Sequence, residues 1–396
     1  MMKPVVNTFF ELLQVAIGNR QALSAVPSEK EWNILFELCK RHSLLGVAFV
    51  GIQKQKRQGG AEVTIPWDVY KQWLGIAMGV QQKNMKMNAE CQKLSDKLSN
   101  DGFLSCIIKG QSNLVNYSCN GDSPYPNNLG MFRNAGDIDI LMRSKENPKC
   151  ISLPVHYCIE ESRKYHKDVF VTYHHTDLYW RDSSGGKKTE SVEAHHRASF
   201  LCSYIRNRRL QHWLEQNMPF GKCEAELGDH RFPIPPTSFN VVYQLLHIFK
   251  HLFESGIGLR QLMDYYFVLK AYNGSDMASK DEVMDTFRSF GMEKFVSVVM
   301  WVLQKVFAMP DEYLLCAPAG ENEGMYLLRE IMIAGNFGHY DQRLKGDGGR
   351  GTISHSWVKT CHNFRLLKHY PEEVLAEPLF RLYHYFWRIL RLWKYE

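Results

Sequence analysis

Two aspartates separated by a single isoleucine, Asp137 and Asp139, begin a short apolar segment that continues to Leu141. Because successive side chains of a β-strand point to opposite faces, a strand here presents both carboxylates on one face and Ile138 and Ile140 on the other. Adjacent carboxylates repel each other, and together they suit a hard divalent cation such as Mg²⁺. The pair therefore predicts metal-assisted phosphoryl chemistry, with a solvated strand end or turn as the commoner alternative.

A second feature lies upstream, where residues 103–108 predict a strand that ends at Lys109 and Gly110. Glycine at a strand end lets the backbone turn sharply and approach a ligand closely. The residues that follow, from Ser112 to Tyr117, predict the start of a short helix, whose free backbone N–H groups are able to hold phosphate. An ordinary strand-to-helix turn is the alternative.

Basic side chains accompany this pattern. Arg133 stands four residues before Asp137, and a guanidinium beside a carboxylate pair either neutralises it or holds a phosphate. The alternative for Arg133 is a surface ion pair. Two later predicted helices carry Lys250 and Arg260, which we expect to face a triphosphate from the helical side. The alternative for Arg260 is a pair with Asp264, one turn further on.

A β-hairpin is predicted downstream. Residues 171–180 are rich in aromatic side chains and predict a strand, residues 183–186 predict a turn, and residues 191–197 predict the return strand. A turn centred on residues 184 and 185 brings two pairs of side chains opposite each other: Asp177 with Glu193, and His175 with His195. A slip of one residue would move these side chains to the other face, so the pairing depends on the register.

The order of these pieces resembles the polymerase-β-like nucleotidyltransferase superfamily, in which a glycine turn precedes an Asp-x-Asp strand and a later strand supplies a third carboxylate. More closely, it resembles an uncharacterised bacterial nucleotidyltransferase family with a Lys-Gly … Arg-x-x-Gly-Asp-Ile-Asp signature, which stands here at residues 109–110 and 133–139. Segments 251–262 and 335–341 are similar to that family too. The resemblance therefore runs from about residue 106 to residue 341.

The resemblance implies a magnesium-dependent transfer of a nucleoside monophosphate from an NTP, with two Mg²⁺ ions and with ATP as the expected donor. It implies that three residues are the catalytic metal carboxylates: Asp137, Asp139 and Glu193. It places four further residues at or near the triphosphate: Lys109, Gly110, Ser112 and Arg133. Two departures affect the phosphate contacts. Gln111 stands where the superfamily usually has Gly or Ser, and residues 110–137 form a longer segment than usual, with a loop-like insertion at 120–128.

The composition is that of a globular protein. The chain has 396 residues, 45% of them hydrophobic, and its net charge of +6 suits polyanions such as NTPs without demanding nucleic acid. The ten cysteines are scattered without a Cys-x-x-Cys pair, which argues against a zinc ribbon or a disulfide framework and predicts a cytoplasmic location. No apolar run has the length of a membrane span, and the N-terminal segment predicts an amphipathic helix rather than a signal peptide.

The secondary-structure signals predict an α+β fold, in which a small mixed-sheet nucleotidyltransferase core is embedded between N-terminal and C-terminal helical regions. We expect three parts: a helical region over 1–100, the α/β core over 101–231 and a helical domain over 232–396. Residues 232–237 predict an extended linker, and the glycine-rich residues 345–352 predict a connector. His247 and His251 have the spacing of a metal pair without the metalloprotease glutamate, so hydrogen bonding in a cleft is the favoured interpretation.

A basic and aromatic helix is predicted from residue 379 to residue 395. Arg381, His384 and Arg388 share one face, while Leu382, Phe386 and their neighbours occupy others. Such a helix is able to bind RNA or anionic lipid, but the favoured interpretation is a terminal helix that packs by its aromatic face and keeps its basic side in solvent.

Other function classes stay open at this stage. The chain could be an antitoxin-like partner or a catalytically inactive module that binds nucleotide or protein. A third alternative is a transition-metal hydrolase, in which the histidine-rich hairpin binds the metal together with Asp177 and Glu193: His174, His175, His195 and His196. For the enzyme, the expected partners are an NTP and an acceptor that is a small molecule, a protein or an RNA, and the oligomeric state is left open.

Overall fold

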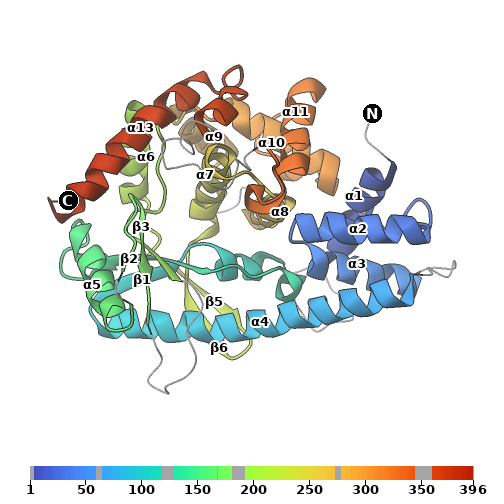
Figure 1. Cartoon of the computed structure of the whole chain (residues 1–396), viewed down its shortest axis with the longest axis horizontal. Coiled ribbons are helices and arrows are strands. Elements are labelled where there is room, and N and C mark those ends of the chain that lie inside the picture. Colours follow the sequence, from blue (N-terminus) through green and yellow to red (C-terminus); the bar gives the residue numbers. More distant parts are fainter. Residues whose placement is uncertain are drawn as a thin grey trace.

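A four-stranded mixed sheet lies between two groups of helices (Figure 1). The computed structural model describes the following residues: 4–58, 65–117, 129–166, 168–180, 192–272, 278–343 and 359–395. Within them the predicted α+β class is confirmed, with a small sheet flanked by helices.

The strands of the sheet are β1 (Phe103–Ile107), β2 (Ile138–Ser144), β3 (His175–Leu178) and β4 (Val192–His195). Their order is β1-β2-β4-β3, with β2 and β4 parallel and the two outer pairs antiparallel. The predicted hairpin register is confirmed: Asp177 pairs with Glu193, and His175 pairs with His195. The turn predicted at residues 183–186 lies outside the described residues, as do the predicted loop at 120–128 and the predicted connector at 345–352.

Four helices precede the sheet: α1 (Pro4–Ile17), α2 (Glu29–Arg41), α3 (Leu45–Gln58) and α4 (Trp67–Asn100). The long helix α4 runs beneath the sheet and contacts both β1 and the later strand β6 (His230–Ile234) (Figure 1). Its buried residues face the sheet core, and Met87, Cys91 and Leu94 lie in one apolar cluster with Ile138 and Ile140 of β2. This packing explains why β2 carries its carboxylates on the opposite face.

The helices after the sheet are α6 (Tyr204–Gln216), α7 (Thr237–Glu254), α8 (Leu259–Tyr272), α9 (Lys280–Ser289), α10 (Glu293–Phe307), α11 (Glu321–Ala334) and α13 (Pro371–Ile389). Helix α5 (Ser152–Arg163) lies between β2 and β3 in the chain and packs on both. One large apolar core joins α1–α3 to α7, α8 and α10. The sheet therefore lies between α4 on one side and α7 and α8 on the other. Side chains of α7 and α8 face the carboxylates of β2 and β4.

One sequence-based expectation about local structure is wrong in part, and another is confirmed. Residues 232–234 of the extended linker expected at 232–237 lie instead in a two-stranded hairpin of β5 (Cys223–Leu227) and β6 (His230–Ile234), and residue 237 begins α7. Pro233 led to the wrong prediction, because a proline inside a short apolar run usually indicates a loop. An edge strand, however, tolerates proline. The short helix expected from Ser112 is the 3-10 helix η1 (Gly110–Tyr117), which begins directly at the glycine turn.

The C-terminal helix packs by aromatic side chains as expected, with Phe380 beside the buried Trp387, but it also leaves a second apolar face exposed. Trp387 is buried as an aromatic packing residue, but Leu382, Phe386 and Ile389 are 50–56% exposed. The other buried residues of α13 are Glu373, Val374 and Glu377, so this helix turns carboxylates inward and an apolar face outward. A helical period identifies two faces but not which of them is buried.

Within the described residues, none of the helices combines the length and the apolar character that crossing a membrane would require.

Candidate active site

Three carboxylates converge where β2 and β4 lie side by side. Asp139 of β2 is paired directly with Glu193 of β4, and Asp137 stands immediately before β2 on the same side as Asp139. All three line a cavity of about 290 Å³ that is closed from the other side by α7 and α8. Gly110 and Arg260 also line this cavity. The structure therefore brings the three predicted carboxylates together around one space.

The electrostatics of this group favour a bound cation. Burial and the neighbouring charges of Asp139 and Glu193 raise the pKa of Asp137 to about 6. Burial also acts to raise the pKa of Glu193, but the hydrogen bond from His195 and the charge of Lys109 outweigh it and hold that pKa below its ordinary value. The carboxylates thus lie together in one half-buried place, and their mutual repulsion is reflected in the raised pKa of Asp137. A divalent cation would relieve that repulsion, so the donor set fits hard metal ions.

Lys109 is the cation that touches this group. Its Nζ atom lies 2.6 Å from Oδ1 of Asp139. Burial alone would lower the pKa of Lys109, but the carboxylate of Asp139 outweighs it and the pKa is raised, so the side chain stays charged. His195 also contacts this carboxylate, with Nε2 3.0 Å from Oδ1 of Asp139 and 3.4 Å from Oε2 of Glu193. His195 therefore bridges the carboxylates of two neighbouring strands.

The glycine turn after β1 has the geometry that its residue type suggested. Gly110 has a positive φ of 62°, and a Cβ atom there would lie 3.4 Å from the carbonyl oxygen of Asp137. Gly110 lines the cavity, whereas Ser112 is fully buried and is not part of its lining. Gln111, the departure from the superfamily pattern, points away and donates to Oδ1 of Asn88 on α4 at 2.7 Å. Its side chain therefore fixes the turn against α4.

Arg133 lines the cavity but is held by a carboxylate. Its Nε and Nη2 atoms donate to Oδ1 and Oδ2 of Asp264 at 2.6 and 2.7 Å, and Tyr117 donates to the same carboxylate at 2.5 Å. All three side chains are buried, so Arg133 forms a buried ion pair rather than a surface one, and its guanidinium is not free to bind phosphate. Arg260 is not the partner of Asp264. Instead it donates through Nη1 to the carbonyl of Asn134 at 2.7 Å, directly before the Asp-x-Asp strand.

Arg260 keeps binding capacity toward the cavity. Its Nε atom is buried without a hydrogen-bond partner among the described residues, and its guanidinium lies 5.5 Å from the ring centroid of Phe337. Burial and the charge of Arg133 lower its pKa to about 10, so it remains a cation at neutral pH. Of the two predicted helical cations, Arg260 therefore faces the candidate site.

Two segments that were singled out in the sequence pack against each other beside the cavity. A Cβ atom on Gly338 would overlap the carbonyl oxygen of Ser255, and one on Gly258 would lie 2.8 Å from Cα of Asn336. These close approaches require glycine, and they place the Phe337 ring beside both Arg260 and His251. The helical segments 251–262 and 335–341 thus form one wall of the site.

The histidines of α7 are hydrogen-bonded to each other, as expected from their sequence context. The Nε2 atoms of His247 and His251 are 3.0 Å apart, and Nδ1 of His251 lies 2.8 Å from Oγ of Ser255. Burial lowers the pKa of both rings well below the ordinary histidine value, so both are neutral.

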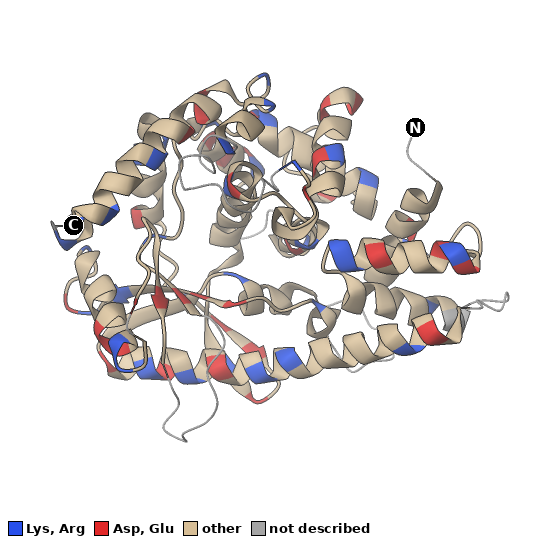
Figure 2. Ribbon diagram, in the orientation of Figure 1, with Lys and Arg blue, Asp and Glu red and all other residues tan. Residues whose placement is uncertain are grey.

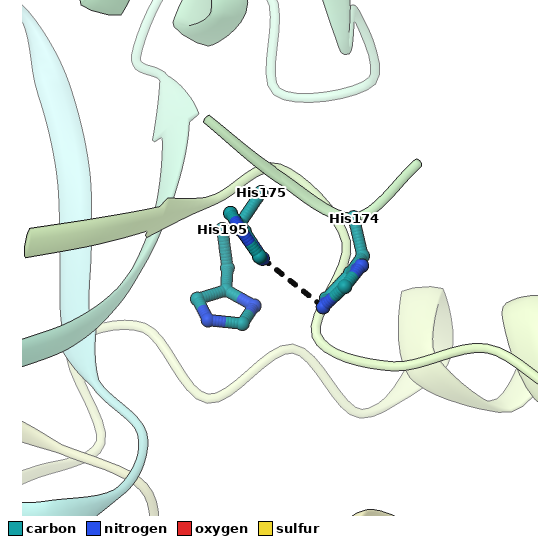
Figure 3. A group of neighbouring side chains, drawn as sticks. All are labelled: His174, His175 and His195. Atoms are coloured by element: carbon teal, nitrogen blue, oxygen red, sulfur yellow. Dashed lines mark hydrogen bonds between the residues drawn. The ribbon is translucent and has the colours of Figure 1, made fainter. Parts of the chain in front are cut away.

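A second histidine group lies on the other side of the carboxylates. Figure 3 shows the rings of His174 and His175 directed toward each other, with His195 beside them. The three rings offer nitrogen atoms that lie within 4.8 Å of one another. However, Nζ of Lys250 lies 2.7 Å from Nε2 of His174, so an amine already contacts that ring nitrogen. Lys250 thereby lies in a neighbouring cavity and outside the lining of the carboxylate cavity.

Comparison with known families agrees with this geometry. A model of the family described as "Uncharacterised nucleotidyltransferase" matches residues 28–308, which is more than two thirds of the chain. The chain belongs to this family of nucleotidyltransferases. It is therefore a transferase that acts on nucleotides, and the family suggests an NTP substrate and the use of a divalent metal. Searches of curated proteins and of solved structures found no match.

Several side chains of this nucleotidyltransferase site were missed from the sequence. Asn113, Gln244 and Phe337 line the cavity, and Asp264 holds Arg133 from 131 positions away. No local spacing connects such distant positions. The contact of His195 with Asp139 was easier to infer, because the predicted strand already placed His195 two residues from Glu193 on the same face.

Proposed function

We propose that this chain transfers a nucleoside monophosphate from an NTP, with ATP as the expected donor, to an acceptor nucleophile in a magnesium-dependent reaction. The observation that carries the proposal is the direct pairing of Asp139 with Glu193 across β2 and β4, with Asp137 beside them in one cavity. Membership of a nucleotidyltransferase family supports the reaction class.

Asp137, Asp139 and Glu193 would hold two Mg²⁺ ions, and the raised pKa of Asp137 supports a site whose carboxylates still repel one another in the absence of metal. Bound there, Mg²⁺ would lower the pKa of an acceptor hydroxyl and would offset the negative charge of the triphosphate and of the leaving pyrophosphate. The protein's own contribution is to hold these carboxylates rigidly on two neighbouring strands. His195 assists by contacting both Asp139 and Glu193.

The cations of the site have separate roles in this proposal. Lys109 is charged, buried and next to Asp139, so it is placed to donate to a phosphate oxygen that approaches the metal carboxylates. Arg260 offers its unpartnered Nε from α8. Arg133, neutralised by Asp264, fixes α8 against the segment that leads into β2. The phosphorus is then attacked in line, and catalysis is mainly positioning and charge stabilisation.

One alternative rests on a specific observation, the imidazole group of His174, His175 and His195, which is able to bind a transition metal for hydrolysis. Elemental analysis of the purified protein separates the two functions. Zinc or iron at one equivalent would favour the hydrolase, whereas a metal-free protein that binds Mg²⁺ together with ATP supports the transferase.

The direct test of the transferase uses NTPs labelled at the α-phosphate, incubated with the protein and a cell extract. We expect a labelled product with Mg²⁺ and a loss of at least about 100-fold with Asp139→Asn. Asp285→Asn, an exposed change on α9, is the matched control and should keep full activity. If Asp139→Asn retains metal-dependent labelling, the proposed centre is wrong.

The nine described cysteines are all free thiols. This state supports the proposal that the enzyme works in the reducing cytoplasm.

A further inference from the structure

The outer face of α13 is apolar from Leu375 onward. Large apolar side chains of α13 and its last turn are 45–71% exposed: Leu375, Leu379, Leu382, Tyr383, Tyr385, Phe386, Ile389 and Leu390. On the inner side, two of the four fully buried residues are Glu373 and Glu377. A monomeric protein rarely leaves a continuous apolar face of this kind in solvent, so the face indicates a binding surface.

The spacing of this face fits a second helix as the occupant. Five of the exposed residues recur at alternating intervals of four and three positions: Leu375, Leu379, Leu382, Phe386 and Ile389. This is the repeat of a coiled-coil seam, whose side chains insert between those of a facing helix. We call these five residues the α13 seam. Amphipathic helices at a membrane surface have a similar apolar face, so the charges and the area of this face decide between the two occupants.

The positions that flank the α13 seam carry no charge: Ala376, Pro378, Tyr383, Tyr385 and Leu390. In coiled coils these flanking positions select partners, and charged residues there exclude some helices. Their absence means that two copies of the same helix meet without like charges along the seam. A seam that is compatible with itself suits a two-fold symmetric contact, in which both subunits use the same patch.

The ends of α13 determine the direction of such a pair. The last turn and the residues beyond it are basic, with Arg388, Arg391 and Lys394, whereas Glu372 stands in the first turn (Figure 2). Parallel pairing would gather the basic ends of both copies together. Antiparallel pairing separates them by the helix length, about 28 Å for 19 residues. It also places each basic end near the half-exposed Glu372 of the other copy, which pairs with Arg206 in its own chain.

We propose that this chain forms a two-fold symmetric homodimer through antiparallel packing of the α13 seam. In antiparallel coiled coils the two kinds of seam position face each other, so Leu379 packs against the partner's Leu382 and Leu375 against the partner's Phe386. The eight exposed side chains offer roughly 100 Å² each, on the order of 800 Å² per copy, which is the size of a standard stable interface.

The first test measures the mass of the full chain in solution by light scattering and sedimentation equilibrium. We expect a dimer at about 10 µM for the unaltered protein, since interfaces of this size have micromolar or tighter dissociation constants. Leu382→Glu places two carboxylates close to the symmetry axis and should raise the dissociation constant about 100-fold or more. Ile34→Glu is the matched control, because Ile34 is also about half exposed, at 46%, but lies on α2.

The second test determines the direction of the helices and does not depend on the folding of a charged variant. A mixture of Leu375→Cys and Phe386→Cys proteins should form disulfide-linked dimers of the two variants. Leu375→Cys alone should form no more disulfide-linked dimer than the unaltered protein does under the same oxidation. Linkage of Leu375→Cys to itself would overturn the antiparallel arrangement.

Two results would overturn the dimer itself. One is a monomer at 100 µM whose seam binds vesicles of phosphatidylserine and loses that binding with Leu382→Glu, which would make α13 a membrane-surface helix. The other is a dimer that Leu382→Glu leaves intact. In both cases the proposed nucleotidyl transfer is unaffected, because α13 contributes no residue to the carboxylate cavity.

Discussion

Replacing Asp137 with asparagine should stabilise the metal-free protein while it removes activity. In the absence of a cation, Asp137 lies against two other carboxylates, and burial together with their charges raises its pKa from 3.8 to about 6. Its charged form is therefore unfavourable in the folded state. Asparagine keeps the shape of the side chain and removes the charge, so the repulsion is lost together with one metal ligand.

The magnitude follows from the pKa. A rise of about two units corresponds to about 3 kcal/mol of folding free energy at roughly 1.4 kcal/mol per unit. Because the folded pKa is raised, the cost is absent below pH 4, where both folded and unfolded forms are protonated, and it is complete above pH 6. We therefore expect Asp137→Asn to gain about 1–3 kcal/mol at pH 8 in EDTA, and this gain should shrink as the pH falls from 6 to 4.

The assay is urea unfolding of both proteins at pH 8 and pH 5, with EDTA and then with excess Mg²⁺. Added Mg²⁺ should stabilise the unaltered protein and stabilise the variant less, because binding to the folded state alone shifts unfolding. Asp139→Asn is the comparison. It removes the partner of the buried Lys109 and should destabilise by about 3–5 kcal/mol. Equal destabilisation by both variants at every pH would refute the assignment of repulsion to Asp137.

Three further outcomes are expected. Arg133→Met leaves Asp264 buried without its partner and should cost about 3–5 kcal/mol in urea unfolding, whereas the Arg133→Met/Asp264→Leu double variant should cost less than the sum of the two single changes. Gly338→Ala, whose Cβ would overlap the carbonyl of Ser255, should cost about 1–3 kcal/mol and reduce nucleotidyl transfer, while Gly79→Ala, with open space around its Cβ, should gain up to about 1 kcal/mol. Dialysis against EDTA should abolish nucleotidyl transfer measured by product labelling, and Mg²⁺ should restore it; unchanged labelling without divalent ions would exclude a metal role for the three carboxylates.

The part of the site that was predicted correctly is the part that depends on local pattern. Strand alternation placed Asp137 and Asp139 on one face, and a turn of defined position fixed the register that brings Asp177 opposite Glu193. The direct pairing of Asp139 with Glu193 required more, because a parallel neighbour cannot be deduced from a hairpin. For that step the resemblance to a nucleotidyltransferase superfamily supplied the third carboxylate.

The parts that were not predicted depend on contacts between distant positions. Whether Arg133 holds phosphate or an ion pair depends on Asp264, and whether Lys250 faces the triphosphate depends on His174, 76 positions away. Which face of α13 is buried is a similar case, since an amphipathic period is equally consistent with either face being buried. In each case the residue type indicated a charge or a face, and only the tertiary packing determined its partner.

The charge balance of the cavity connects these observations to the chemistry. Its three carboxylates are opposed by Lys109 and Arg260, because Arg133 is already neutralised by Asp264 and the histidines of α7 are neutral. A bound triphosphate, with roughly four negative charges, would leave this half-buried space strongly negative, which is unfavourable at low dielectric. Two divalent cations bring the sum close to neutrality. The arrangement of protein charges therefore favours nucleotide binding together with metal, and we expect ATP to bind weakly to the metal-free protein and much more tightly with Mg²⁺.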